Sequence, residues 1–371
     1  MKILVLGGTG AMGVDLVKIL AKRGEDVTVT SRSERKSEFD NVKYVKGDAH
    51  DTAFLKSVLI EKYDSIVDFM VYNTKEFKAR RDLLLGSTNQ YVFLSSSRVY
   101  ADSETPITED SPRLLDVTSD SEYLKTDEYA LTKARQENML RKSGKTNWTI
   151  IRPYITYSNQ RLQLGVYEKE LWLYRALHDK TIVFPKAIAE KYTTMTLGAD
   201  VAMGISKLIG NDKAMGEAFH ITTDKSIKWE DILSIYKRVF NEVTGKKLKI
   251  KYADDPKPIY EAMGNKYQVI YDRLFDRRFD NTKFLQAVGE FEFVSPETGL
   301  EKCLREFLEK PAFRTTATFA LMDKLTGERT RLSDISGVKK KCKYLAVRYL
   351  PMKVILFIKA CKRKMIKSGW I

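Results

Sequence analysis

A cluster of glycines at the start of the chain places the strongest limit on its fold. Gly7-Gly8-Thr9-Gly10-Ala11-Met12-Gly13 follow the apolar run 2–6 and lead into 11–22, where apolar residues recur at helical spacing. Glycines let the backbone turn sharply and approach a pyrophosphate, and a helix N-terminus offers free N–H groups. A plain tight turn is the alternative, but a preceding strand and a following helix are the context that dinucleotide binding requires. We predict that this segment contacts a cofactor through Gly7, Thr9, Gly10, Ala11, Met12 and Gly13.

Strands and helices alternate through the first part of the chain. Apolar runs bounded by turn residues predict strands at 2–6, 26–30, 42–45, 65–70, 90–94 and 148–151, with helical patterns between them. This alternation predicts an α/β fold with a doubly wound parallel sheet, which binds ligands at the carboxyl ends of its strands. Beyond residue 152 the pattern loosens into a smaller mixed α/β domain. We expect a dinucleotide-binding domain at 1–155, to which some later segments return, a substrate domain at 156–312 and a basic helical extension at 313–371.

The end of the second predicted strand indicates which dinucleotide binds. Sites for NAD usually hold the ribose with an acid at this point, but here the residues are Thr30-Ser31-Arg32-Ser33. A guanidinium flanked by hydroxyls can bind a 2′-phosphate, so Ser31 and Arg32 favour NADP over NAD, with a solvated basic loop as the alternative. Asp48, after the third strand, could meet the adenine amino group or simply form a turn.

A tyrosine, a lysine and a group of serines are candidates for catalysis. Tyr129 and Lys133 are four residues apart in a helical pattern, 127–141, and therefore share a helix face. A nearby ammonium lowers the pKa of a phenol and enables it to act as acid or base. The strand 90–94 ends in Ser95, Ser96 and Ser97, where a hydroxyl can hydrogen-bond a substrate oxygen as its charge changes.

These pieces together resemble the extended short-chain dehydrogenase/reductase superfamily, in its branch of NAD(P)-dependent nucleotide-sugar epimerases, dehydratases and reductases. The matching segments are GGTGAMG (7–13), GDAHD (47–51), SSSRVY (95–100), PITEDSP (106–112), YALTK (129–133), IIRPYITY (150–157) and LGADVA (197–202). The resemblance implies a Rossmann-type sheet, Tyr129 as acid/base, Lys133 as the residue that orients ribose and tyrosine, and Ser96, in preference to Ser97, as the catalytic hydroxyl. It also implies that Met70, at the end of the fourth strand, contacts the cofactor.

The sequence departs from the family pattern at three places, and the first of these departures narrows the expected activity. Ser97-Arg98 stands where family dehydratases carry an Asp-Glu pair, which disfavours a 4,6-dehydratase. The segment between Val71 and Tyr91 is shorter than usual for the helix that helps form family dimers, which puts the homodimer in doubt. Met70 replaces the small residue typical of the fourth strand. The sequence thus predicts an NADP-dependent epimerase or reductase of a nucleotide sugar. A dinucleotide sensor or an RNA-binding protein on the same fold is the alternative.

The charge of the chain is concentrated at its C-terminal end. The net charge is +15, but residues 331–371 hold twelve Lys or Arg and one acid, a net of +11, which leaves +4 for residues 1–330. Within this tail, apolar residues interleave with Arg348, Lys353 and Lys359, and Pro351 interrupts the pattern. A basic amphipathic helix is typical of a membrane surface element. A helix packed on the protein body is the alternative, and nucleic-acid binding is less favoured.

Cysteine content and the N-terminus bear on the compartment. The three cysteines, Cys303, Cys342 and Cys361, are odd in number and lack metal-ligand spacing. They fit a reducing compartment, and the first apolar run is too short for a signal peptide. We therefore expect a cytoplasmic protein without a metal, in peripheral contact with the inner membrane face if the tail acts on a membrane surface.

Overall fold

The computed structural model describes residues 1–313, 319–351, 353–355, 357–358 and 361, and these residues divide into two compact units. The first unit comprises Met1–Arg161, Tyr192–Ile227 and Phe275–Gly299, and the second comprises Leu162–Lys191, Lys228–Leu274 and Leu300–Ile371. The chain therefore returns to the first unit twice. The expected ranges 1–155, 156–312 and 313–371 remain a prediction of functional domains.

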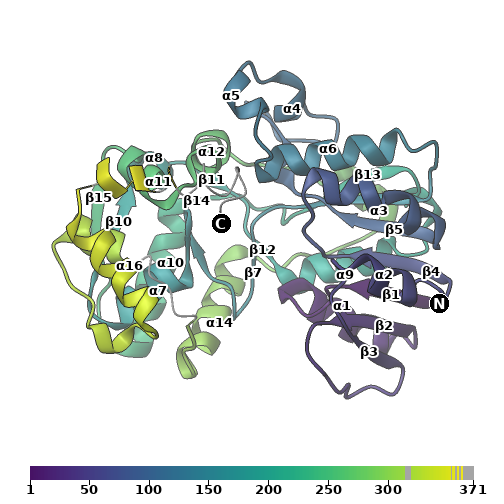
Figure 1. Ribbon diagram of the computed structural model, residues 1–371, viewed down its shortest axis with the longest axis horizontal. Helices are drawn as coiled ribbons and strands as arrows, with labels where there is room; N and C mark the ends of the chain where they lie inside the picture. The colour runs from purple at the N-terminus through teal and green to yellow at the C-terminus, as the bar shows by residue number, and fades with distance from the viewer. Residues whose placement is uncertain (314–318, 352, 356, 359–360, 362–371) are drawn as a thin grey trace. The chain divides into compact units, whose positions relative to one another are not determined.

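A seven-stranded parallel sheet forms the centre of the first unit (Figure 1). Its strand order is β13-β6-β5-β4-β1-β2-β3. Strands β2 and β3 extend the sheet to one side of β1, and β4 and the later strands extend it to the other side, so the strand order reverses between β1 and β4. The strands are β1 Lys2–Leu6, β2 Asp26–Ser31, β3 Val42–Lys46, β4 Tyr63–Asp68, β5 Thr88–Leu94, β6 Trp148–Pro153 and β13 Glu217–Ile221. The predicted α/β fold with a doubly wound parallel sheet is confirmed. Strand β13, which lies within the range 156–312 expected for the smaller domain, forms an edge of this sheet beside β6.

Helices cover both faces of the sheet because each presents an apolar stripe to it. The stripes of α1 (Ala11–Lys22) and α9 (Gly198–Leu208) share one cluster with Val5, Val27 and Val29. On the other face, α2 (Thr52–Val58), α3 (Thr74–Gly86) and α6 (Tyr129–Arg141) pack against Leu4, Ile66 and Tyr91. The remaining elements of this unit are η1 Ser97–Val99, α4 Leu114–Val117, α5 Ser121–Leu124, β7 Thr156–Tyr157, β11 Tyr192–Thr193, β12 Thr196–Leu197, η2 Asp212–Ala214 and α13 Thr282–Val288.

The second unit is smaller in its sheets and richer in helices. Its strands β10 (Thr181–Pro185) and β15 (Lys249–Ala253) pair in parallel, and β8 (Gln163–Leu164) and β9 (Tyr167–Glu168) pair antiparallel. Its helices are α7 Lys169–Leu177, α8 Lys186–Ala189, α10 Trp229–Thr244, α11 Lys257–Met263, α12 Lys266–Gln268, the π-helical turn η3 Val269–Arg273, α15 Phe319–Thr326, the turn η4 Leu332–Asp334 and α16 Val338–Tyr349. Strand β14 (Ile227–Lys228) and helix α14 (Pro296–Glu309) lie where the chain passes from one unit to the other.

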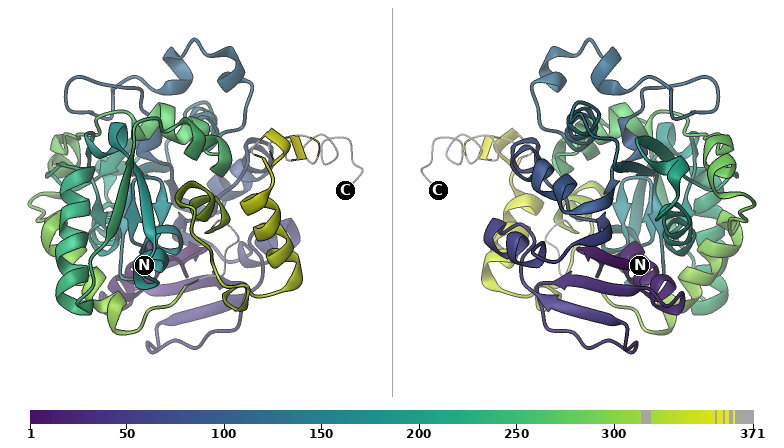
Figure 2. Two further views of the ribbon diagram at one scale, coloured as in Figure 1. Left: turned by 90° about the vertical axis from the view of Figure 1, so that its left-hand side faces the viewer. Right: turned by 90° about the vertical axis from the view of Figure 1, so that its right-hand side faces the viewer.

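The basic extension is packed, in part, on the second unit (Figure 2). Phe319 and Ala320 of α15 and Tyr344 of α16 share a buried cluster with Tyr174 of α7. We gave a helix packed on the protein body as one alternative for the basic tail. The face of α16 that carries Tyr344 is packed in this way. Lys359 and residues 362–371, which the sequence assigns to the same basic segment, lie outside the described residues. No helix in the described part of the chain has the length and apolar character needed to cross a bilayer.

Candidate cofactor and active site

The glycine segment forms a tight turn between β1 and α1. Gly7 has a φ of +68°, a conformation that favours glycine, and its N–H donates to Thr30 Oγ1 at 3.0 Å. A Cβ on Gly13 would lie 2.7 Å from the backbone of Gly8. Gly7 thus allows the backbone to turn, and Gly13 allows α1 to pack closely on that turn.

The exposed side of this turn has room for an anion. A Cβ on Gly10 would meet no heavy atom of the described residues within 4 Å. Gly10 precedes α1 without a side chain to cap it, and the first turn of α1 has no acid. Gly10 and Ala11 are exposed, whereas Thr9 and Met12 are half-buried. Free N–H groups at the positive end of a helix dipole favour a phosphate here, so these residues fit the pyrophosphate of a dinucleotide.

The other predicted cofactor residues lie at the ends of neighbouring strands. Ser31 ends β2 and is buried, and Arg32 directly after it is exposed. Asp48 is exposed, and its Oδ1 accepts the His50 N–H at 3.0 Å, so this carboxylate forms a turn. The strand predicted at 65–70 ends earlier, at Asp68. Met70 lies against the glycine turn, because a Cβ on Gly7 would come within 2.9 Å of its Sδ.

The three serines after β5 have different partners. Ser95 Oγ donates to Glu137 Oε1 at 2.5 Å, and Ser97 Oγ donates to the Arg152 carbonyl at 2.6 Å. Ser96 Oγ accepts the Arg98 N–H at 3.2 Å, and its hydroxyl lies near enough to the Tyr129 phenol to influence the pKa of that phenol. Of the three serines, only Ser96 is among the main influences on the Tyr129 pKa, and its catalytic role remains a prediction.

The electrostatic surroundings of Tyr129 differ from those expected. Tyr129 is 37% exposed as a residue, but enclosure of its hydroxyl raises the pKa of the phenol. The nearby charge of Arg98, the neighbouring Ser96 hydroxyl and the charge of Arg161 oppose that rise. The guanidinium carbon of Arg98 lies 5.4 Å from the centroid of the Tyr129 ring. Lys133, which we expected to lower this pKa, is not among its main influences, whereas Arg98, which we did not predict to act on the phenol, is. The one sequence signal for Arg98 was its place two residues after Ser96.

Lys133 is buried one helical turn after Tyr129. Its Nζ donates to the carbonyl of Leu94, at the end of β5, at 2.6 Å and lies 4.6 Å from the centroid of the Phe93 ring. Burial lowers the pKa of Lys133 to about 8, although the charges of Asp68 and Glu137 act in the opposite direction. Asp68, at the end of β4, accepts the Tyr91 hydroxyl at 2.8 Å. Lys133 thus lies at the carboxyl edge of the sheet, within the influence of two buried carboxylates.

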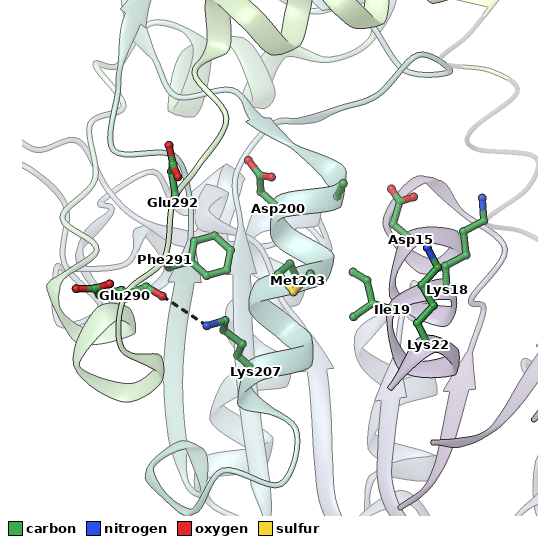
Figure 3. Close-up of a pocket in the computed structure, with 11 residues that line it drawn as sticks. Asp15, Lys18, Ile19, Lys22, Asp200, Met203, Lys207, Glu290, Phe291 and Glu292 are labelled. Atoms are coloured by element: carbon green, nitrogen blue, oxygen red, sulfur yellow. Dashed lines mark hydrogen bonds between the residues drawn. The ribbon is translucent and has the colours of Figure 1, made fainter. Parts of the chain in front are cut away.

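A cavity of about 510 Å³ lies apart from the predicted site residues, between α1 and α9 (Figure 3). Asp15 and Lys18 come from α1, and Asp200 and Lys207 come from α9, so its charges are mixed. Burial raises the pKa of Asp200 to about 6. Among the described residues, no three His, Cys, Asp or Glu side chains are grouped to hold a metal.

Comparisons with known proteins agree with this geometry. Residues 7–171 match a family described as NAD(P)H-binding. The "Chloroplast stem-loop binding protein of 41 kDa b" of Arabidopsis thaliana is 28% identical over 251 residues, which are 62% of this chain and 61% of that protein. The UDP-glucose 4-epimerase of Lactobacillus helveticus is 32% identical over 134 residues, 30% of this chain and 41% of that enzyme. The chain therefore spans about three-fifths or less of the length of these curated relatives.

Solved structures extend the likeness to most of the chain. The UDP-glucuronic acid 4-epimerase of Bacillus cereus, in complex with UDP-glucuronic acid and NAD, is 17% identical with a TM-score of 0.62. The match covers 84% of this chain and 100% of that one. Fold and site thus define a protein with an NAD(P)H-binding domain. Its structural neighbours are nucleotide-sugar epimerases and dehydratases, and the predicted resemblance to the extended short-chain dehydrogenase/reductase superfamily is confirmed.

Proposed function

We propose that this chain is a cytoplasmic NAD(P)-dependent epimerase or reductase that acts on a nucleotide-activated sugar. The observation that carries the proposal is the position of Ser96, just after β5, near Tyr129 at the start of α6. The phenol lies one helical turn before the buried Lys133. A protein that only bound a dinucleotide would not need this arrangement.

The cofactor would be held by the turn between β1 and α1. Gly7, Thr9, Gly10, Ala11, Met12 and Gly13 would contact the pyrophosphate side of the dinucleotide, with Met70 against the same turn. We favour NADP, because exposed Arg32 follows Ser31 and no carboxylate ends β2. NAD remains the alternative, since the Bacillus cereus neighbour binds it. The nicotinamide ring supplies the site that accepts or donates a hydride.

Side chains of the chain itself would manage the proton of the substrate. Tyr129 would take the proton of a sugar hydroxyl, or return it, while Ser96 hydrogen-bonds the same oxygen as its charge changes. The Arg98 charge favours the ionised phenol, and Lys133 would bind the ribose of the cofactor. An Arg at position 98, rather than a carboxylic acid, agrees with epimerisation or reduction and not with elimination of water.

The cofactor assignment can be tested by fluorescence titration of the purified chain with NADPH and NADH. We expect tighter binding of NADPH, and Arg32→Ala should weaken NADPH binding about tenfold or more while leaving NADH unchanged. Arg35→Ala, a second exposed arginine in the same loop, is the matched control and should have little effect. If neither nucleotide binds, the proposal fails.

The reaction can be tested by incubating the chain and its cofactor with a panel of nucleotide sugars and separating the products. We expect conversion of at least one, and Tyr129→Phe should slow it by about 10²–10⁴-fold without weakening cofactor binding. A Tyr129→Phe protein with full activity would remove Tyr129 from the reaction.

A second candidate function, RNA binding, is supported by one relative. The Arabidopsis thaliana protein that matches over 251 residues is named as a stem-loop binding protein. Retention of a stem-loop RNA by the purified chain, weakened by salt, would support this candidate. Equal retention by Tyr129→Phe would separate such binding from the proposed reaction.

A further inference from the structure

We propose that the C-terminal basic helix α16 and the helical residues after it bind the surface of an anionic lipid bilayer. This inference is independent of the proposed enzyme activity. It rests on an exposed apolar stripe, on the exposed lysines of the same helix and on the way in which α16 is fixed to the second unit.

Helix α16 has two apolar faces, of which only one is buried. Tyr344 packs in the cluster with Phe319 and Tyr174, and Val347 packs against that cluster. Another set of residues recurs at spacings of four, three and four, which places them on one side of the helix. This exposed stripe consists of Val338, Cys342, Leu345 and Tyr349. Val338 is 77% exposed and Tyr349 is 55% exposed.

The exposed apolar surface continues past the end of α16. Leu350 is extended, as expected before a proline, and the Val354 and Ile355 N–H groups donate to the Pro351 carbonyl. A helical turn therefore begins again. Among its described residues, Phe357 is 69% exposed and Ile358 is 51% exposed. Apolar residues this exposed, in sequence with a helical stripe, indicate a surface that is covered in use.

The charge of the same helix indicates what covers the stripe. Between Arg331 and Lys353 the sequence has seven Lys or Arg and one acid, Asp334. Lys339, Lys340 and Lys343 are exposed on the same helix. Anionic lipid attracts such residues, and their long side chains can reach the headgroups while the stripe enters the boundary with the acyl chains.

Other occupants fit these observations less well. Two copies of this helix would bring like charges together, and RNA would leave the aliphatic side chains Val338, Leu345 and Ile358 without a role. The helix is also held in place from behind. Asp323 of α15 accepts the Tyr344 hydroxyl at 2.8 Å and an Arg175 guanidinium N–H at 2.6 Å. The stripe is thus presented on an ordered surface of the second unit.

Flotation of the full-length chain with lipid vesicles tests the proposal. We expect binding to phosphatidylcholine vesicles with about 30 mol% phosphatidylglycerol, and at least about tenfold weaker binding to phosphatidylcholine alone. Val338→Asp with Leu345→Asp should abolish binding, and Lys339→Glu with Lys340→Glu and Lys343→Glu should weaken it about tenfold or more. Ile60→Asp, which changes an 82% exposed apolar residue of the first unit, is the matched control and should bind as the unchanged chain does.

Because all these side chains are exposed or half-exposed, we expect every variant to fold. Thermal unfolding of each variant checks this expectation. No binding to either vesicle would overturn the proposal. So would stem-loop RNA binding that the lysine variant loses and the Val338→Asp, Leu345→Asp variant keeps. A dimer in sedimentation that the stripe variant alone dissociates, without vesicle binding, would instead assign the stripe to a second copy.

Discussion

Glu137 of α6 and Arg152 of β6 form a two-pronged ion pair in the interior of the first unit. Arg152 Nη2 lies 2.7 Å from Glu137 Oε2, and Arg152 Nε lies 2.9 Å from Glu137 Oε1. Ser95 and Arg113 also donate to Glu137. Glu137 therefore ties β6, through Arg152, and the end of β5, through Ser95, to the helix that carries Tyr129 and Lys133.

Removal of the Glu137 charge should destabilise the first unit. Glu137→Gln leaves the buried Arg152 charge without its carboxylate, and breaking a buried pair from one side costs about 3–5 kcal/mol. We expect this loss in the free energy of unfolding measured with urea. Glu122→Gln, at an exposed pair with Lys125, should change little. Equal stability of the two variants would contradict the importance of the pair.

Gly13 and Gly10 of the cofactor turn should respond differently to alanine. Gly13→Ala forces a methyl group to within 2.7 Å of the Gly8 backbone, and such overpacking costs about 1–3 kcal/mol. Gly10→Ala meets no described heavy atom within 4 Å, so the free energy of unfolding should stay nearly unchanged. Nucleotide titration of Gly10→Ala is a second measurement, and it should show weakened binding if the pyrophosphate lies over this residue.

Lys133 should make stability depend on pH above neutrality. Its pKa falls from 10.5 to about 8 on folding, so between these values the unfolded chain binds a proton that the folded chain has released. Stability from this group therefore rises with pH in that window, by roughly 1 kcal/mol between about pH 8 and pH 9. Urea unfolding of the unchanged chain and of Lys133→Met at both values should show the rise only in the former. A parallel dependence in the two proteins would exclude Lys133 as its source.

The Asp323 carboxylate should hold the basic extension in place. It accepts bonds from Arg175, Thr330 and Tyr344, which lower its pKa although burial opposes them. In Asp323→Asn the amide cannot balance the buried guanidinium, so we expect faster tryptic cleavage within 339–343. Asp334→Asn, at an exposed acid of the same segment, should be cleaved as the unchanged chain is. Because the pKa of Asp323 is lowered, its stabilising effect should be lost as the pH falls below the ordinary aspartate value.

Much of the site could be predicted from the sequence because its signals are local. The glycine turn, the serines that end β5 and the spacing of Tyr129 and Lys133 each lie within a few neighbouring residues. The parallel strands then bring their carboxyl ends to one edge of the sheet. The electrostatics of the site could not be predicted in this way. The position of Arg98 near the Tyr129 ring, and the approach of Lys133 to Leu94, depend on side chains that are distant in sequence.

The sequence by itself determined the α/β class, the cofactor turn and the order of the candidate catalytic residues, since backbone preferences and hydrophobic spacing act over short distances. Only the tertiary structure decided that β13 completes the main sheet and that Ser95 and Ser97 bond Glu137 and the Arg152 carbonyl. It also decided which face of α16 is buried. These outcomes depend on which groups, distant in the sequence, bond each buried polar atom or cover each apolar surface. Such contacts form only when the chain packs into its tertiary structure.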